Sequence, residues 1–220
     1  GGAWQNSVAD GNIAIGAHAF SGAINGSDDC IAIGRNAMTG DVSSGKTIAI
    51  GTNALITLTT GAENIAIGSD SMKYVRHGSK NVIMGHTAMD ESNVSTFADS
   101  TCDYDDGTTI THDANANIVQ GLYVTGTGIP DRSYIVSLTD GTHFVLNNST
   151  TGGAVTNGTL TFWVEPRETV AIGYGTMGGD WVAGAVYDNT TLGALTLSGN
   201  LNCASKNTAL GNRCLSSATA

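Results

Sequence analysis

The sequence predicts an all-β protein, a parallel β-solenoid with one inserted antiparallel β-module. Three observations predict this fold: a short motif ending in Ile-Gly recurs along the chain, its copies lie 17 to 20 residues apart, and one gap of 88 residues interrupts them. The composition agrees, because 30 of the 220 residues are glycine and only 2 are proline. Such a chain repeatedly needs a residue without a Cβ, and the lack of a Gly-X-Y period excludes collagen.

The motif is a short apolar run that closes on a glycine. Eight copies end at Gly16, Gly34, Gly51, Gly68, Gly85, Gly173, Gly193 and Gly211. A unit of this length is too short for a pair of helices and suits one coil of a β-solenoid. Isoleucine is β-branched and alternates with alanine, so each motif predicts a short strand, with its glycine at a bend.

A second apolar position follows most of these glycines by four residues. It is occupied by Phe20, Met38, Leu55, Met72, Met89, Met177, Leu197 and Leu215. We expect this segment to form a second short strand, and the polar, glycine-rich links between units to form the turns of the coil.

The alternation within each strand predicts two different faces. We expect the isoleucines to fill the narrow lumen and the alanine between them to face outward. An alanine kept on an outward face indicates close packing against another backbone, most simply in a homotrimer around a threefold axis. The predicted trimer interface is Ala14, Ala32, Ala49, Ala66, Ala171 and Ala209. The alternative is a monomeric solenoid in which alanine is merely tolerated.

The repeated unit, as in Asn64-Ile-Ala-Ile-Gly68, resembles the repeat of the head domains of trimeric autotransporter adhesins. It is also similar to arrays in bacteriophage tail fibres. The resemblance implies a left-handed parallel β-roll, a trimeric assembly, an extracellular or virion-surface location and a role in attachment. The fifth copy departs from the pattern, with Ile83 and Met84 where Ala-Ile is expected, and Thr176 and Thr196 replace the small alanine of later copies.

The interruption divides the chain into solenoid repeats over 1–89, an inserted module over 90–168 and further repeats over 169–220. Apolar or alternating runs separated by Gly and Asp turn signals predict a small antiparallel sandwich or barrel. Its five expected strands are Thr108–Thr111, Ile118–Val124, Tyr134–Leu138, His143–Leu146 and Leu160–Val164.

A module carried on a rigid stalk is a natural place for recognition. Sugar rings stack on aromatic faces and aromatic side chains anchor interfaces, so we expect receptor or glycan contacts from this module. The candidates are Tyr104, Tyr123, Tyr134, His143 and Trp163. The alternative is that these side chains pack the module's own core.

The densest acidic cluster is Asp103, Asp105 and Asp106. Carboxylates in this pattern are a weak candidate for Ca²⁺, although the spacing of an EF-hand is missing, and a solvated acidic turn is the favoured explanation. As a pair they would also suit acid/base chemistry on a glycan. No nucleotide-binding, hydrolase or histidine metal motif occurs, so we expect no cofactor and no enzymatic activity.

The net charge and the spacing of the cysteines limit the classes of partner and metal that the chain is expected to bind. The formal net charge of −10, from 9 Lys+Arg against 19 Asp+Glu, argues against nucleic acid, and no apolar run is long enough to insert into a membrane. Cysteines 30, 102, 203 and 214 show no C-x-x-C spacing that would indicate zinc. Pairing of Cys203 with Cys214 and buried thiols both remain open.

These features predict a non-enzymatic attachment protein, a segment of a trimeric tail fibre or surface adhesin that contacts a cell-surface glycan or protein receptor. We expect adjoining fibre domains or stacked subunits at both ends, because an open coil exposes unpaired strand edges. A self-assembling subunit of an extracellular filament is the first alternative, and a glycan-degrading tailspike is the second.

Overall fold

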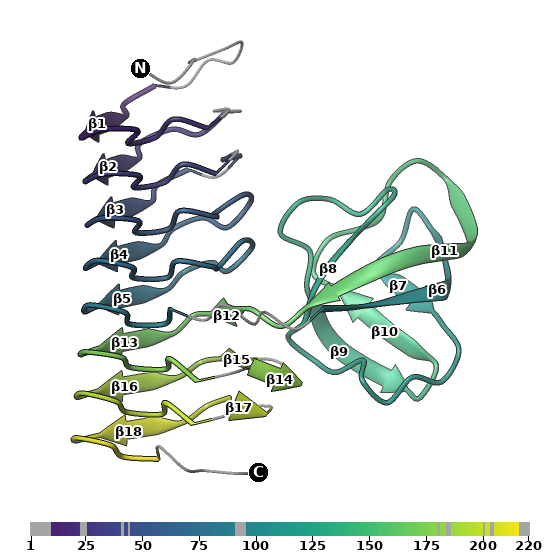
Figure 1. Ribbon diagram of the computed structural model, residues 1–220. Helices are drawn as coiled ribbons and strands as arrows, with labels where there is room; N and C mark the ends of the chain where they lie inside the picture. Colours follow the sequence, from purple (N-terminus) through teal and green to yellow (C-terminus); the bar gives the residue numbers. More distant parts are fainter. Residues whose placement is uncertain are drawn as a thin grey trace.

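The computed structural model describes residues 10–22, 26–40, 42–43, 45–90, 96–179, 181–183, 186–199, 201–202 and 205–215. These residues form strands and turns, and they contain no helix with the length and apolar character that crossing a membrane requires. The predicted parallel β-solenoid with an antiparallel insertion is confirmed. Figure 1 shows the coils stacked in a column with the module at one side.

The column is built on one eight-stranded parallel sheet. Its strands, in spatial order, are β1 (Ile13–Ile15), β2 (Ile31–Ile33), β3 (Ile48–Ile50), β4 (Ile65–Ile67), β5 (Val82–Met84), β13 (Val170–Ile172), β16 (Thr190–Leu192) and β18 (Thr208–Leu210). Equivalent residues pair across coils, as Ala49 pairs with Ala32 on one side and Ala66 on the other. The repeat in the sequence is therefore the repeat in space.

The inserted module does not break this stack. β5 pairs directly with β13, with Val82 opposite Val170 and Met84 opposite Ile172. The backbone N–H of Val82 donates to the Thr169 carbonyl at 2.8 Å, as the equivalent residues do between other coils. The long interruption thus leaves from the turn of one coil and returns to the next.

The orientation of the strands corrects the sequence-based prediction. Ala32, Ala49 and Ala66 are fully buried inside the coil, whereas the isoleucines on either side of each are only half-buried, and Ile13 and Ile15 of the first described coil are 48% and 58% exposed. Both residue types are apolar, so alternation alone did not reveal which face was inward. The lumen already holds a large side chain from the following turn, so the strand residue that faces it is small in most coils, with Ile83 and Thr191 as its larger occupants.

The six alanines predicted as a trimer interface therefore face their own lumen. Ala171 and Ala209 are buried as well. Ala14 is exposed, and it belongs to the first coil that the structure describes. A side chain with almost no exposed surface cannot contact a second chain, so the five buried alanines do not form an intermolecular interface. The surface-facing residues of the same strands are the isoleucines.

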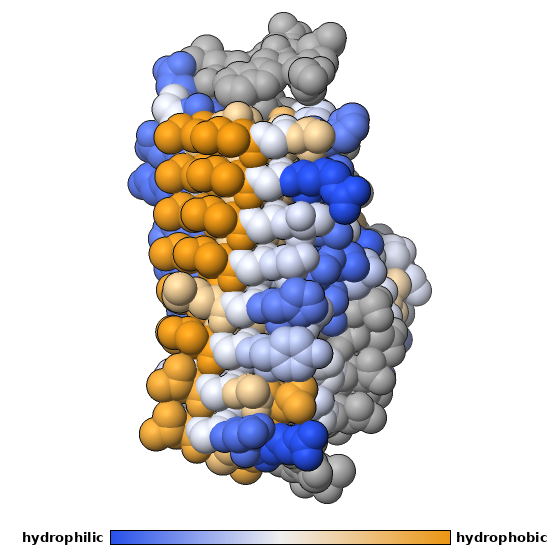
Figure 2. All heavy atoms as spheres, turned by 60° about the vertical axis from the view of Figure 1, so that its left-hand side comes forward, coloured by the Kyte–Doolittle hydropathy of each residue, from blue (hydrophilic) through white to orange (hydrophobic). Residues whose placement is uncertain are grey.

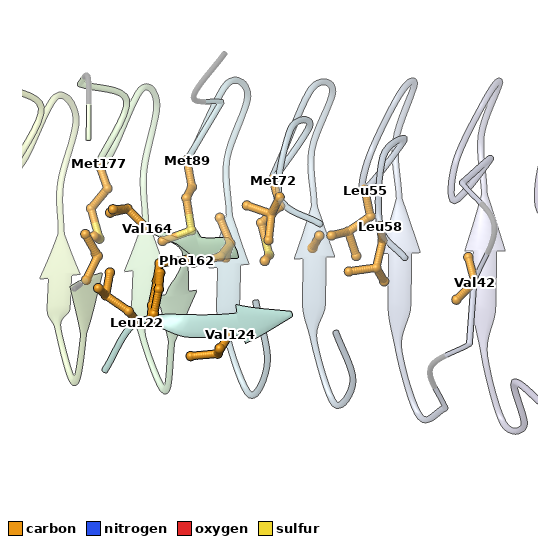
Figure 3. Close-up of a cluster of buried hydrophobic side chains, with 14 of the residues drawn as sticks. Val42, Leu55, Leu58, Met72, Met89, Leu122, Val124, Phe162, Val164 and Met177 are labelled. Atoms are coloured by element: carbon orange, nitrogen blue, oxygen red, sulfur yellow. The ribbon is translucent and has the colours of Figure 1, made fainter. Parts of the chain in front are cut away.

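The second apolar position lies in a turn and not in the expected second strand. Met38, Leu55 and Met72 have φ of 49°, 51° and 50°, the left-handed conformation, and their side chains are fully buried in the lumen. Figure 3 shows Leu55, Met72, Met89 and Met177 following one another along the column. The backbone of this turn also bonds from coil to coil, as Met38 N–H donates to the Ala54 carbonyl at 3.0 Å. Burial offsets the cost of about 1–2 kcal/mol of the left-handed backbone.

The repeat glycines are required by close contact between coils. Gly51 has a φ of +137°, and a Cβ built on it would lie 2.3 Å from the carbonyl oxygen of Gly68. The same contact recurs from each repeat glycine to the next along the stack. Only a residue without a side chain permits this approach.

A ladder of buried polar side chains precedes the strands. Asn64 and Asn81 are fully buried, and Asn81 Nδ2 donates to Asn64 Oδ1 at 3.1 Å. The Thr169 N–H donates in turn to Asn81 Oδ1 at 3.1 Å, which continues the ladder past the insertion. Each side-chain amide thus forms hydrogen bonds with its neighbour in the next coil, as buried polar groups need a hydrogen-bond partner.

The module is a six-stranded antiparallel sheet in the order β8-β11-β6-β7-β10-β9. The bounds are β6 (Thr96–Asp105), β7 (Thr109–Thr111), β8 (Tyr123–Gly126), β9 (Ile135–Asp140), β10 (His143–Leu146) and β11 (Ala154–Trp163). Strand β6 was not predicted, because its residues are mostly polar. The strand expected at Ile118–Val124 is β8, which begins five residues later, at Tyr123. The core of the module joins the core of the solenoid through Phe162 and Val164, as Figure 3 shows.

Two small parallel pairs complete the coils beyond the module. β12 (Pro166–Arg167) pairs with β15 (Val186–Tyr187), and β14 (Trp181–Ala183) pairs with β17 (Leu201–Asn202). The first of these pairs begins three residues after β11 ends, so the chain re-enters the solenoid directly from the module.

Candidate binding site at the base of the inserted module

The structure separates the five predicted contact residues into three places. Tyr104 is buried in the module, and its hydroxyl donates to the Thr127 carbonyl at 2.6 Å, so it is a core residue. His143 lies on the outer face of the module, where Nδ1 is 2.9 Å from an Asp140 oxygen. Tyr123, Tyr134 and Trp163 lie together at the base of the module, next to the solenoid.

Trp163 joins the module to the solenoid. Its Nε1–H donates to Thr125 Oγ1 at 2.9 Å, and its ring meets the ring of His77 edge to face with centroids 4.8 Å apart. The guanidinium of Arg76 lies 5.9 Å from the Trp163 ring. These contacts hold the half-buried ring in a structural joint between module and solenoid, so its main role here is packing.

A buried carboxylate forms the centre of this joint. Glu165 is 1% exposed, and its oxygens accept the backbone N–H groups of Arg76 at 3.2 Å and Gly78 at 2.8 Å. The N–H of His77 also donates to this carboxylate. Burial raises the pKa of Glu165 to about 7, and the three N–H bonds and the Arg76 charge oppose that rise.

The His77 imidazole lies beside this carboxylate joint. Its Nδ1 is 2.8 Å from Thr60 Oγ1. Burial, with a smaller contribution from the charge of Arg76, lowers the pKa of His77 to about 4. The ring is therefore neutral at neutral pH and packs as an aromatic group against Trp163.

A row of charged corner residues forms the solenoid wall of the site. Each residue lies just before the inner polar ladder, has a positive φ and stacks above its equivalent in the next coil. The row is Asp29, Lys46, Glu63, Lys80, Glu168, Asp188 and Lys206. Opposite charges alternate along its first five members, which favours this stacking register over a shifted one.

A cavity of about 190 Å³ lies between this row and the module. Glu63, Lys80 and Glu168 line it from the solenoid, and Arg132 and Tyr134 line it from the module. Tyr123 is almost fully buried at its floor, where its hydroxyl lies beside Ser79 without a well-aligned hydrogen bond. Two of the predicted contact residues therefore meet in one cavity.

Most charged groups around the cavity have partners. Glu168 accepts from Arg167 Nη1 at 3.0 Å and lies 3.8 Å from Lys80 Nζ. The Arg167 guanidinium lies 4.1 Å from the centre of the Tyr134 ring and 5.5 Å from that of Tyr187. Arg167 thus covers Tyr134, and the predicted stacking of a sugar on that face is not available.

Arg132 and Glu63 also line the cavity, but neither forms an ion pair with a described residue. Arg132 donates from Nε to the Thr60 carbonyl at 3.1 Å and from Nη2 to the Ser43 carbonyl at 3.4 Å, contacts that hold the module against the solenoid. Among the described residues it makes no ion pair within 4.0 Å, and the carboxylate of Glu63 has no hydrogen-bond or ion-pair partner.

The acidic cluster does not form a cation site. Asp103 accepts the Asn157 N–H at 2.7 Å and Asp106 accepts the Gly153 N–H at 2.8 Å, so both stabilise turns of the module. Asp105 is exposed at the end of β6. No group of three acidic, histidine or cysteine side chains in the described ranges is arranged to hold a metal ion.

The cysteines that the structure describes, at positions 30, 102 and 214, carry thiols. Burial raises the pKa of Cys102 to about 12, helped by the charges of Asp99 and Asp103. Cys203, which the sequence left open as a partner of Cys214, lies outside the described residues.

Glu63, Glu165 and Arg132 were not among the residues predicted from the sequence. A usable signal existed for Glu63, because it holds the same place in its repeat as Lys46 and Lys80. Glu165 and Arg132 reach solenoid partners 72 to 89 residues away, and no local pattern marks such contacts.

Comparison of the chain with models of known protein families, with curated proteins and with solved structures returns no match. The function must therefore be argued from the fold and the surfaces described above.

Proposed function

We propose that the chain is a non-enzymatic structural attachment protein, a segment of a trimeric fibre or surface adhesin. In this proposal the solenoid is the shaft, and it associates with other copies through the outward face of the eight-stranded sheet. The inserted module contacts a receptor or glycan on a cell surface. The protein then acts outside the cell or on a virion, as the resemblance of its repeat implies.

The observation that carries the proposal is the exposed apolar face of the sheet. Figure 2 shows it as a continuous hydrophobic column along the stack. Among its residues Ile13, Ile15, Met84, Leu192 and Leu210 are between 36% and 71% exposed. Soluble monomers rarely expose a contiguous apolar patch of this kind, which favours a protein–protein interface.

The size of the face is sufficient for a stable assembly. Each of the eight strands presents two outward side chains. If each buries about 50 Å², one chain contributes roughly 800 Å², the amount that each partner buries in a typical specific interface. The strands and the module lie on opposite sides of the column in Figure 1, so association through the strands leaves the modules free.

Sedimentation of matched variants tests this proposal. Lysine in place of Ile33, Ile50 and Ile67 puts three charges on the outward face without changing the lumen, so we expect trimers to become monomers with unchanged circular dichroism. The control Leu138→Lys charges an exposed apolar residue of the module and should remain trimeric. A monomeric parent protein would overturn the proposal, and polymers of indefinite length would support the filament alternative instead.

A further inference from the structure

The cavity at the base of the module contains two opposite charges that do not pair with each other. Arg132 engages two backbone carbonyls through Nε and Nη2, which leaves Nη1 without a described protein partner. The Glu63 carboxylate also lacks a partner, although both side chains line the same space. An arrangement with an available donor and an available acceptor suits a ligand that has both functions.

The dimensions of the cavity limit that ligand. Its volume of about 190 Å³ lies below the roughly 300 Å³ at which pockets for drug-sized molecules begin. One ring-sized unit fits, and a longer molecule must extend out of the opening. The side chains of Lys80 and Glu168 are 56% and 37% exposed, so the opening reaches solvent.

The charges of the lining favour a neutral ligand. Lys80, Arg132 and Arg167 oppose Glu63 and Glu168, which leaves a formal charge of only +1. An anionic ligand would meet two carboxylates, and a cationic ligand would meet three cations. Hydroxyl groups both donate and accept, so neighbouring hydroxyls on one ring match the mixed lining.

From these observations we propose that the cavity binds one neutral pyranose unit of a glycan, with Arg132 donating to its hydroxyls and Glu63 accepting from them. Tyr134 contributes its edge and hydroxyl, because Arg167 already covers its face. The inference rests on the proposed attachment function and names its ligand class. In the proposed trimer the cavity stays open, since it lies on the module side of the column.

Ligand-observed nuclear magnetic resonance with the full chain tests this site. The probes are glucose, galactose, mannose and N-acetylglucosamine at millimolar concentration, with glucuronic and N-acetylneuraminic acids as charged counterparts. We expect at least one neutral sugar to bind, with affinity reduced about tenfold or more by Glu63→Gln and by Arg132→Gln. Glu63→Gln is the cleaner variant, because this carboxylate makes no hydrogen bond or ion pair with a described residue and Gln keeps its size.

Two control variants match these changes. Asp188→Asn and Lys206→Gln alter corner residues of the same row outside the cavity, and they should leave sugar binding unchanged. Binding of acidic sugars alone, or binding that is insensitive to Glu63→Gln, would overturn the neutral-pyranose assignment. Absence of any sugar signal while the assembly still adheres to glycan-coated surfaces would overturn the cavity and leave the attachment function standing. An assembly that adheres to no cell or glycan surface would instead overturn the attachment function.

Discussion

The joint between module and solenoid predicts an unusual pH dependence of stability, which Glu165→Gln should expose. Burial raises the pKa of Glu165 from its ordinary value of 4.5 to about 7 in the folded chain. Between these values the folded state retains a proton that the unfolded state has lost. Glu165 therefore stabilises the fold below about pH 4.5, and this contribution disappears as the pH rises through 7.

The magnitude follows from the shift. A change from 4.5 to about 7 corresponds to about 3 kcal/mol at 1.36 kcal/mol per pH unit. His77 acts in the opposite sense, because its pKa falls from 6.5 to about 4, so its contribution is present above pH 6.5 and is lost as the pH falls through 4. Between pH 4.5 and 6.5 the pH dependences of the two contributions nearly cancel, so the stability of the wild-type chain changes little with pH in this range.

Urea denaturation at pH 5, 6, 7 and 8 measures the effect. Glu165→Gln removes one titration, so the stability of the variant relative to wild type should increase by about 3 kcal/mol from pH 5 to pH 8. Lost hydrogen bonds to Arg76, His77 and Gly78 add a constant offset that does not alter this trend. Val164→Ala, a buried change without a titrating group, should give a profile parallel to wild type. A parallel profile for Glu165→Gln as well would show that Glu165 has the same pKa in the folded and unfolded chain.

Two further predictions concern the coils and the thiols. Gly51→Ala should cost about 3 kcal/mol or more in thermal unfolding, because its Cβ would overlap the Gly68 carbonyl, whereas Gly141→Ala, which meets no atom within 4 Å, should change stability by less than about 0.5 kcal/mol. Equal costs would show that the coil contact is not the reason for the glycine. Cys102 should resist iodoacetamide at pH 8 while the half-exposed Cys214 is alkylated, as followed by peptide mass spectrometry, because a pKa of about 12 leaves almost no thiolate. Faster labelling of Cys102 than of Cys214 would contradict the burial argument.

The periodic features of the fold could be predicted from the sequence because they depend on local spacing. Each Ile-Ala-Ile-Gly run forms a strand followed by a bend, and the gap between Gly85 and Gly173 contains the antiparallel module. The direction in which Ile and Ala point could not be predicted in the same way. It depends on Met38 and its equivalents, whose left-handed turn conformation sends a large side chain into the lumen.

The candidate site could be predicted from the sequence only in part. Tyr123 and Tyr134 were recognised as aromatic residues of the module, yet the cavity also requires Arg132, Glu63 and the corner row of the solenoid. These groups come together because Glu165 anchors the returning chain on the backbone of residues 76–78. A contact between segments nearly 90 residues apart has no signature in local sequence.

Cryo-electron microscopy of the native assembly tests most directly the claim that the sheet is the shaft interface. We expect three columns in contact through the outward isoleucines of β3 and β4, with Ile50 and Ile67 at the interface and the modules pointing away from the common axis. Columns that contact each other through another face, or a hydrophobic column left in solvent, would contradict this claim.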